Sequence, residues 1–512
     1  MQASTVAVTL CGLEPHLVQV EVDSGRGLPC FSIVGLPEIT VRESRVRVRA
    51  ALRQLDVDLN EFVITVNLAP AYLRKTGSAF DLAIAVGVLA ALGRVASGRL
   101  KDTVLLGELS LTGQLRPVRG ALPALLGAQR RGLKQAVVPT DNAAEVVAID
   151  GLTTRTASHL NEVVRHFNGQ VELALATPQV ASCAPSSQVD LAEVRGQATA
   201  RRALEIAAAG SHHLLMVGPP GAGKTMLARR LPTILPPMTP RESLAVSAVH
   251  SVAGLLEHGQ GLLQERPFRA PHHTISPAAL LGGGQPLRPG EISLAHHGCL
   301  FLDELLEFQR RAIESMREPL DSGEITICRA RSRAVFPAQP MLVAAVNPCP
   351  CGHAGDPTRC RCSPDRIQNY RNRLSGPLID RIDLHVILPA LTIRHISDGQ
   401  SGESSATVRA RVVRARDRQR DRVKRGETLA PFNAKLSSSD LDRFAKPDAK
   451  GRCLLQRAVE KMGLSMRSYQ KLRRVARTVA DLDGSDTIRS DHFAEAIQFR
   501  CLDRDSRPHV SS

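Results

Sequence analysis

The sequence contains no tryptophan and only 3 tyrosines among its 512 residues. Aromatic side chains are therefore too few to build a base-stacking platform, which disfavours that kind of nucleic-acid surface. No apolar run approaches the roughly 18–20 residues that a membrane-spanning helix needs. The N-terminus also lacks the basic segment and following apolar segment of a secretory signal. We therefore expect a cytoplasmic protein with no membrane partner.

Acidic side chains are fewer than basic ones. The chain has 50 Asp and Glu against 66 Lys and Arg, a formal net charge of +16, and residues 401–512 hold 25 basic and 15 acidic side chains. This excess is typical of proteins that bind nucleic acid through its backbone phosphates without sequence preference, and it also fits a solvated basic surface. The 11 cysteines are odd in number and, without a secretory signal, indicate reduced thiols or metal ligands rather than disulfides.

Two polar, loop-like stretches, residues 177–188 and 397–407, divide the chain into three regions. We expect three domains and two connections, at residues 1–175, 176–189 (linker), 190–395, 396–406 (loop) and 407–512.

Each region has its own pattern. In the first, strand-like runs at 6–10, 18–22 and 62–66 and a buried helix over 80–92 predict a mixed α+β domain. The apolar strands of the second region predict an α/β fold with an open parallel sheet covered by helices. The third region is helical in pattern. Its helix over 407–425 places Val408, Val412 and Ala415 on one thin apolar stripe, and its many arginines predict a basic exterior.

The most informative segment follows the apolar run 214–217 and precedes a helical pattern. It has the glycine spacing of a phosphate loop, in which successive backbone N–H groups turn inward around a nucleotide triphosphate. Lys224 can reach the β- and γ-phosphates, and the Thr225 hydroxyl can bind Mg²⁺. The loop consists of Gly218, Pro219, Pro220, Gly221, Ala222, Gly223, Lys224 and Thr225.

Two further apolar strands end in polar side chains that complete this chemistry. Residues 299–302 are followed by Asp303 and Glu304, and residues 341–346 by Asn347. We expect Asp303 to hold Mg²⁺ and Glu304 to activate the attacking water. Asn347 is expected to bind the γ-phosphate or that water.

Two arginines follow later, Arg381 after a Gly-Pro break and Arg467 at the start of a helix. The order of the phosphate loop, the Asp-Glu strand, the Asn-tipped strand and these arginines resembles AAA+ ATPases. The segments 267–274 and 282–296 resemble the magnesium-chelatase-like branch and, within it, the ComM family, along nearly the whole chain.

This resemblance implies an ATP- and Mg²⁺-dependent homo-oligomer, usually a hexameric ring. It implies a DNA branch-migration helicase that acts on single-stranded or branched DNA during natural transformation, with recombination proteins as further partners. Lys224 and Thr225 match the Walker A positions, and Asp303 and Glu304 the Walker B pair. Three residues match positions that sense or stabilise the phosphates: Asn347 (sensor 1), Arg381 (arginine finger acting in trans) and Arg467 (sensor 2).

The family also implies two DNA-facing elements, an insertion near residues 276–297 and a hairpin around 325–335. In the hairpin, Arg329, Arg331 and Arg333 alternate in sequence. On one strand they would project from one face and could grip phosphates, although a solvated strand face has the same pattern.

Cys349, Cys351, Cys360 and Cys362 lie within fourteen residues, on a loop rich in Gly, Pro and Asp. Two Cys-x-Cys pairs at this spacing can surround a tetrahedral Zn²⁺. We predict a structural zinc site that fixes the loop after Asn347.

Residues 75–81 and 107–113 resemble the Lon protease domain. Aligned with Lon-type peptidases, the catalytic serine position falls on Ala79 and the lysine position on Leu122. Without a nucleophile or a base, proteolysis should be absent, although Ser78 lies only one residue away. We expect an assembly or DNA-contacting scaffold.

Two alternatives share the ATPase core. One is a chelatase-type motor that inserts Mg²⁺ into a porphyrin, which the Lon-like region and the basic C-terminal region disfavour. The other is an ATP-dependent protease, which Ala79 and Leu122 disfavour.

Overall fold

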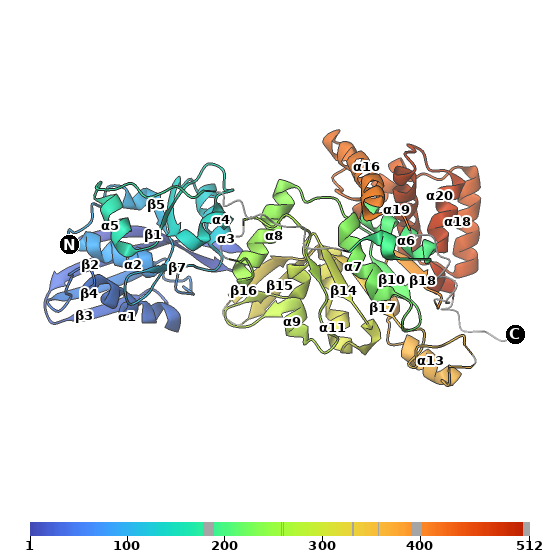
Figure 1. Cartoon of the computed structure of the whole chain (residues 1–512), viewed down its shortest axis with the longest axis horizontal. Coiled ribbons are helices and arrows are strands. Elements are labelled where there is room, and N and C mark those ends of the chain that lie inside the picture. Colours follow the sequence, from blue (N-terminus) through green and yellow to red (C-terminus); the bar gives the residue numbers. More distant parts are fainter. Residues whose placement is uncertain are drawn as a thin grey trace.

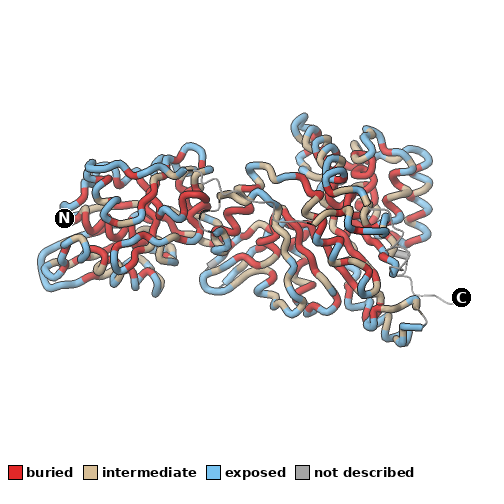
Figure 2. Tube along the Cα trace, in the orientation of Figure 1, coloured by how far each residue is buried: buried red, intermediate tan, exposed pale blue. Residues whose placement is uncertain are grey.

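The computed structural model describes residues 1–177, 189–257, 259, 261–329, 332–356, 358–390 and 402–504. Most of the predicted linker and much of the predicted loop over 396–406 lie outside these ranges. The chain forms three bodies along one long axis: an N-terminal α+β body, a central α/β body and a C-terminal helical body (Figure 1). Each body has a buried interior and an exposed outer surface (Figure 2).

The N-terminal body contains a seven-stranded mixed sheet in the order β3-β4-β2-β1-β5-β8-β9. The three predicted strands are confirmed, as parts of β1, β2 and β4. The strands are β1 (Gln2–Cys11), β2 (Glu14–Arg26), β3 (Cys30–Val34), β4 (Phe62–Ala69), β5 (Thr103–Leu105), β8 (Gln135–Pro139) and β9 (Thr153–Ala157), with a separate pair, β6 (Glu108–Leu109) and β7 (Leu115–Arg116).

The predicted buried helix is confirmed as α2 (Asp81–Ala91), whose residues are almost all buried because it packs against β1 and β2. Its first residue, Asp81, is buried but accepts a 2.5 Å bond from Arg47 Nε, which satisfies the charge. The other helices are α1 (Ile39–Arg53), α3 (Ala121–Arg130), α4 (Ala143–Val146) and α5 (Leu160–Phe167).

The central body contains a five-stranded sheet in the order β11-β14-β17-β10-β18, and every neighbouring pair is parallel. The predicted open parallel sheet is therefore confirmed. Its strands are β11 (Phe268–Arg269), β14 (Cys299–Leu302), β17 (Met341–Val346), β10 (Leu214–Val217) and β18 (Leu384–Ile387).

Helices cover both faces of this sheet, so its side chains enter two cores. Leu214 and Met216 join one core with the C-terminal helices, whereas Leu215 joins the other with Leu300 and Leu302. This alternation follows from the two-residue period of a strand. The helices are α6 (Ala198–Gly210), α7 (Lys224–Ile234), α8 (Pro240–Ala253), α9 (Pro277–Leu281), α10 (Glu291–Leu294), α11 (Arg310–Ser315), α12 (Arg317–Ser322), α13 (Pro364–Arg371) and α14 (Gly376–Ile379).

The C-terminal body consists of α16 (Ser405–Lys424), α17 (Ser438–Phe444), α18 (Ala449–Met462), α19 (Met466–Leu482) and α20 (Ser490–Gln498). Val408, Val412 and Ala415 of α16 are buried, as predicted. The basic exterior predicted for this helix is confirmed only in part, because Arg416 and Arg422 are buried while its other arginines are exposed or partly exposed. Arg416 donates to the Ala208 carbonyl, and Arg422 forms a buried ion pair with Asp481.

The N-terminal and central bodies are in direct contact through α3 and α8. Ser251 Oγ donates a 2.6 Å bond to Glu145 Oε2, and Gly120 N donates to the Ser251 carbonyl at 3.2 Å. In the part of the chain that the structure describes, no helix combines the length and apolar character that crossing a bilayer requires.

Candidate active site

The phosphate loop connects the end of β10 to the start of α7. Gly221 and Gly223 have φ values of 78° and 88°, a left-handed region in which a side chain would be strained. Lys224 begins α7 and is only 8% exposed. Its Nζ donates to the carbonyls of Gly218 (2.6 Å) and Pro219 (3.0 Å) and to Asn347 Oδ1 (3.0 Å). The predicted proximity of the loop and Asn347 is thus present in the structure.

Burial lowers the pKa of Lys224, and the nearby carboxylates of Asp303 and Glu304 oppose this shift. A buried ammonium is stabilised by acceptors. The acceptors around Lys224 are neutral carbonyl and amide oxygens. Phosphate oxygens are charged and would therefore bind the Lys224 ammonium more strongly than these acceptors do.

Asp303 and Glu304 follow β14, next to β17 at the same sheet edge. Asp303 Oδ2 accepts a 2.6 Å bond from Thr225 Oγ1, so the two expected Mg²⁺ ligands are adjacent. Glu304 has φ 52°, and its side chain is 50% exposed. The Glu304 carboxylate therefore lies beside the loop with access to water. His273 Nδ1 lies 3.9 Å from Glu304 Oε2, a contact that the motifs did not predict.

Gln197 is another residue that the sequence analysis missed. It has φ 50° just before α6, and its Nε2 donates to the carbonyls of Ala222 (3.4 Å) and Pro389 (3.0 Å). Gln197 thereby joins the phosphate loop to the segment after β18. The Gly-Gln pair at the start of a helix was its only signal in the sequence.

Arg381 lies far from the phosphate loop of its own chain. It precedes β18, and Asp383 N donates to the His213 carbonyl at the beginning of β10. The phosphate loop follows the other end of β10, whose four residues span about 13 Å. Arg381 and the loop therefore lie at opposite ends of the sheet's strands: the loop at the carboxyl ends, and Arg381 at the amino ends.

The Arg381 guanidinium is held within its own chain. Its side chain is 15% exposed and forms an ion pair with Asp321 of α12, and one nitrogen also donates to the Pro377 carbonyl at 2.8 Å. Asp321 lies in none of the sequence motifs of the site.

Arg467, in the first turn of α19, is exposed and lies beside the Arg381 segment. The neighbouring Ser468 Oγ donates to Asp380 Oδ1 at 3.4 Å, and Lys471 Nζ donates to the Arg381 carbonyl at 2.6 Å. Like Arg381, Arg467 thus lies at the end of the sheet opposite its own phosphate loop, beside the amino ends of the strands.

Lys471 also forms a buried ion pair with Asp383, with 2.7 Å between Nζ and Oδ1. Burial alone would raise the pKa of Asp383, but the Lys471 ammonium and the nearby rings of His212 and His213 hold it well below its usual value. This pair fixes α19 to the segment that carries Arg381.

The four cysteines converge after Asn347. Their sulfur atoms all lie within 4.8 Å of one another, and three separations are 3.3, 3.7 and 3.9 Å. Zn–S bonds of 2.3 Å in a tetrahedron place the sulfurs about 3.8 Å apart, so the donor set fits Zn²⁺. Hydrogen bonds from the His353 backbone and from the Cys349 thiol lower the pKa of Cys351 to about 6. This loop also touches the phosphate loop, since a Cβ on Gly352 would lie 2.4 Å from Cδ of Pro220.

The hairpin is present as β15 (Glu324–Arg329) and β16 (Ser332–Pro337). The expected single row of arginines is wrong, because the chain turns after Arg329. Arg329 pairs with Ser332 and Cys328 with Arg333, so Arg329 and Arg333 are on different strands and opposite faces. Arg331 lies outside the described residues. The predicted insertion contains a second short hairpin, β12 (Gly282–Gly283) and β13 (Arg288–Pro289).

At the Lon-like position, Ser78 Oγ donates to Glu108 Oε2, while Leu122 is fully buried among apolar side chains. The position aligned with the catalytic lysine therefore carries no base in the structure.

Comparison with known proteins places this arrangement in a family. Residues 190–396 match the family described as magnesium chelatase, subunit ChlI; residues 20–142 match subunit ChlI of Mg-chelatase; and residues 402–500 match its C-terminal part. The competence protein ComM of Haemophilus influenzae is 45% identical over 96% of this chain and 96% of its own length. The chain belongs to the ComM family.

The uncharacterized protein YifB of Escherichia coli is 43% identical, over 96% of both chains. Lon protease 1 of Bacillus subtilis is 28% identical over 31% of this chain and 22% of the protease, in agreement with a Lon-like N-terminal body. For this member of the ComM family, the relationships support the binding of ATP and Mg²⁺.

Proposed function

We propose that the chain is an ATP-dependent DNA motor, a branch-migration helicase that acts on single-stranded or branched DNA as a homo-hexameric ring. The observation that carries this proposal is the separation of the site into two halves. One half lies at the carboxyl ends of the strands and contains the phosphate loop, Asp303, Glu304 and Asn347. The other half lies at the opposite ends of the strands and contains Arg381 and Arg467. A second subunit would bring its arginines to the first half, which makes hydrolysis depend on assembly.

The roles of the residues follow from their contacts. Lys224 exchanges the carbonyls of Gly218 and Pro219 for β- and γ-phosphate oxygens. Thr225 and Asp303, already hydrogen-bonded to each other, would hold Mg²⁺, which neutralises the developing charge on the phosphates. Glu304 takes the proton of the attacking water, and Asn347 orients that water or the γ-phosphate.

Arg381 has to leave Asp321 before it can reach the nucleotide of a neighbouring subunit. Asp321 is on α12, which packs against β15 of the arginine-bearing hairpin. Movement of the hairpin on DNA can therefore change the position of Asp321 and the availability of Arg381. This connection would make hydrolysis respond to DNA.

The experiment is an ATPase assay with and without single-stranded or forked DNA, joined to an unwinding assay on three- and four-stranded junctions. We expect DNA to stimulate hydrolysis and Lys224→Ala to abolish both activities. Absence of stimulation, together with no retention of DNA at low salt, would contradict the proposal.

Two other functions are measured alongside. The match to magnesium chelatase families favours a chelatase-type motor as the second candidate, and Mg²⁺ insertion into a porphyrin in the presence of ATP tests it. Casein degradation tests the third candidate, a protease, which the buried Leu122 disfavours.

We also propose that Cys349, Cys351, Cys360 and Cys362 hold a structural Zn²⁺. The fit of the four sulfurs supports this assignment, and the contact of Gly352 with Pro220 gives the site a role in supporting the phosphate loop. Metal analysis of tag-free protein that found far less than one zinc per chain would contradict it.

A further inference from the structure

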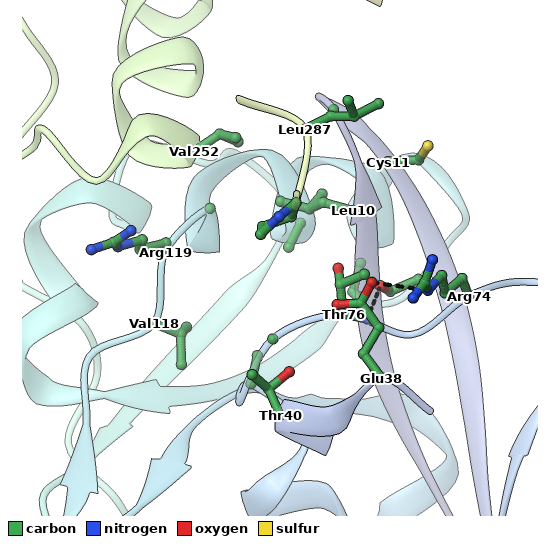
Figure 3. A pocket seen from close by; sticks show the side chains of 18 of the residues that line it. Leu10, Cys11, Glu38, Thr40, Arg74, Thr76, Val118, Arg119, Val252 and Leu287 are labelled. Atoms are coloured by element: carbon green, nitrogen blue, oxygen red, sulfur yellow. Dashed lines mark hydrogen bonds and ion pairs between the residues drawn. The ribbon is translucent and has the colours of Figure 1, made fainter. Parts of the chain in front are cut away.

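A cavity of about 1130 Å³ lies between the N-terminal body and the two hairpins of the central body. The end of β1, the segments 72–79 and 117–121, and residues 284–288 contribute to its wall, as do Arg329 and Arg333. Figure 3 shows Arg74, Arg119, Leu10 and Leu287 around this space. It exceeds the roughly 300–1,000 Å³ of ordinary small-molecule pockets, so a larger ligand fits it.

The charge of the cavity wall is strongly positive. Five arginines line it against two acidic residues, Glu38 and Glu108, and both carboxylates are already engaged. Glu38 pairs with Arg74 at 2.9 Å, and Glu108 accepts a bond from Ser78 Oγ. The remaining arginines are exposed and form no ion pair among the described residues: Arg119, Arg288, Arg329 and Arg333.

These arginines come from both bodies, and close contacts between the two bodies hold the walls of the cavity together. A Cβ on Gly12, at the end of β1, would lie 2.8 Å from Cβ of Ala334 in β16. Cys11 Sγ donates to the Arg333 carbonyl at 3.0 Å. The half of the hairpin next to its turn is thus seated on the β1–β2 turn, and the arginines are held around one space rather than spread over a surface.

The cavity also contains the position at which a Lon-type protease would carry its nucleophile, since Ser78 and Ala79 line it. In this chain the position aligned with the protease lysine is the buried Leu122, and arginines outnumber acidic residues in the cavity wall. This part of the cavity therefore has the charge of a site for a polyanion.

We propose that this cavity, the interdomain groove, binds a segment of single-stranded nucleic acid through its backbone phosphates. The inference rests on the proposed function and assigns a binding surface to the Lon-like body. A flexible single strand can enter a groove walled by several chain segments, whereas a duplex is a stiff rod. Arg119 and Arg288 contact the strand in addition to the hairpin arginines, so the groove continues the path that starts at the hairpin.

The test compares two double variants of the full-length protein. Arg119→Gln with Arg288→Gln removes two groove charges, one from each body. The control, Arg53→Gln with Arg131→Gln, removes two exposed arginines at or just beyond the far ends of α1 and α3. The first turns of these same helices contribute Thr40 and Ala121 to the groove. Both variants lose the same net charge.

The measurement is the affinity for a fluorescent oligothymidine as a function of salt concentration. Each lost phosphate contact should reduce the logarithmic salt slope by about 0.7, and thus by about 1.4 for the groove variant. The control should keep the slope of the parent protein, and both variants should keep the basal ATPase rate, since none of these residues touches the nucleotide site.

Tyr72 gives an independent readout, because it lines the groove, is 85% exposed and the chain has no tryptophan. In the Tyr72→Trp variant, oligothymidine should quench the single indole, and a duplex of equal length should compete poorly.

Two results would overturn the inference: an unchanged salt slope in the groove variant while the parent protein binds oligothymidine, or quenching by unfolded casein but not by oligothymidine. Failure of the parent protein itself to bind DNA would instead contradict the proposed function. The two failures are therefore distinguishable.

Discussion

At the scale of single residues, the proposed activation of water depends on the conformation of Glu304. Its φ of 52° is uncommon for a residue other than glycine, and its backbone N donates a 3.0 Å bond to Asp303 Oδ1. This geometry directs the two consecutive carboxylates to different tasks. Asp303 is bound to Thr225, while Glu304 is half exposed and can meet water.

We predict that Glu304→Gln binds ATP but lowers turnover by at least about 100-fold, since an amide cannot accept the proton of the attacking water. Nucleotide retention and phosphate release, measured on the same preparation, check this. Ordinary turnover by this variant would remove Glu304 from the proposed role.

Asp321→Asn should release Arg381. An ion pair with a solvent-exposed partner contributes about 0.2–1 kcal/mol, so we expect basal ATPase activity to rise by up to about fivefold and stimulation by DNA to fall accordingly. The control is Glu318→Gln on the same helix, which is also exposed. An increase that persists in an Asp321→Asn, Arg381→Ala double variant would contradict an effect that acts through Arg381.

At the scale of elements, α19 connects the helical body to the segment before β18 that carries Arg381. Lys471 reaches both the Arg381 carbonyl and the buried Asp383, and Arg500 donates to the Ile382 carbonyl at 2.6 Å. These contacts attach the Arg381 segment to the helices behind it. A shift of α19 would consequently move Arg381.

Removing Lys471 should be costly, because it leaves Asp383 as an uncompensated buried charge. We predict that Lys471→Met lowers the free energy of unfolding of this part of the chain by about 3–5 kcal/mol. The exposed Lys450→Met in α18 should change it by no more than about 0.5 kcal/mol. Denaturant titration followed by circular dichroism measures both; equal stability of the two variants would refute the role of the pair.

The cysteine loop links a second element to the nucleotide. Cys360→Ser should lower the zinc content and weaken ATP binding, because the loop that holds Gly352 against Pro220 would lose its fixed shape. Cys453→Ser, an exposed cysteine of α18, is the matched control. Metal content and nucleotide affinity are measured together, and full zinc in the Cys360→Ser protein would contradict the ligand assignment.

The elements of the site differ in how well the sequence predicts them. The proximity of three site residues was predictable. Asp303 and Asn347 directly follow apolar strands, and Lys224 begins the helix after another. The carboxyl ends of parallel strands lie at the same end of a sheet. The ion pair of Arg381 with Asp321 joins residues 60 positions apart, and no local pattern signals it. The hairpin arginines were misplaced because alternation in sequence does not show where a strand turns.

At the scale of the whole molecule, the two halves of the site lie at opposite ends of the strands of one sheet, and in the proposed ring each half would need a second subunit. Two inactive variants should therefore complement each other. In an equal mixture of Lys224→Ala and Arg381→Ala proteins, about one interface in four would join an intact phosphate loop to an intact Arg381.

We predict that this mixture regains about a quarter of the parent ATPase rate, measured after subunit exchange. A mixture of Lys224→Ala with Glu304→Gln is the control and should stay inactive, because both changes affect the same half. Intact rings with no regained activity would place Arg381 outside the composite site.

The separation of Lys224 from Arg381 has a consequence for the behaviour of the protein at low abundance. If Arg381 acts on a neighbouring subunit as proposed, a solitary copy would hold nucleotide without hydrolysing it, and specific activity should climb steeply once copies begin to meet. Cells that make little of this protein would keep it in an inactive, nucleotide-bound form. Branched DNA that gathers several copies would then activate hydrolysis at the DNA itself.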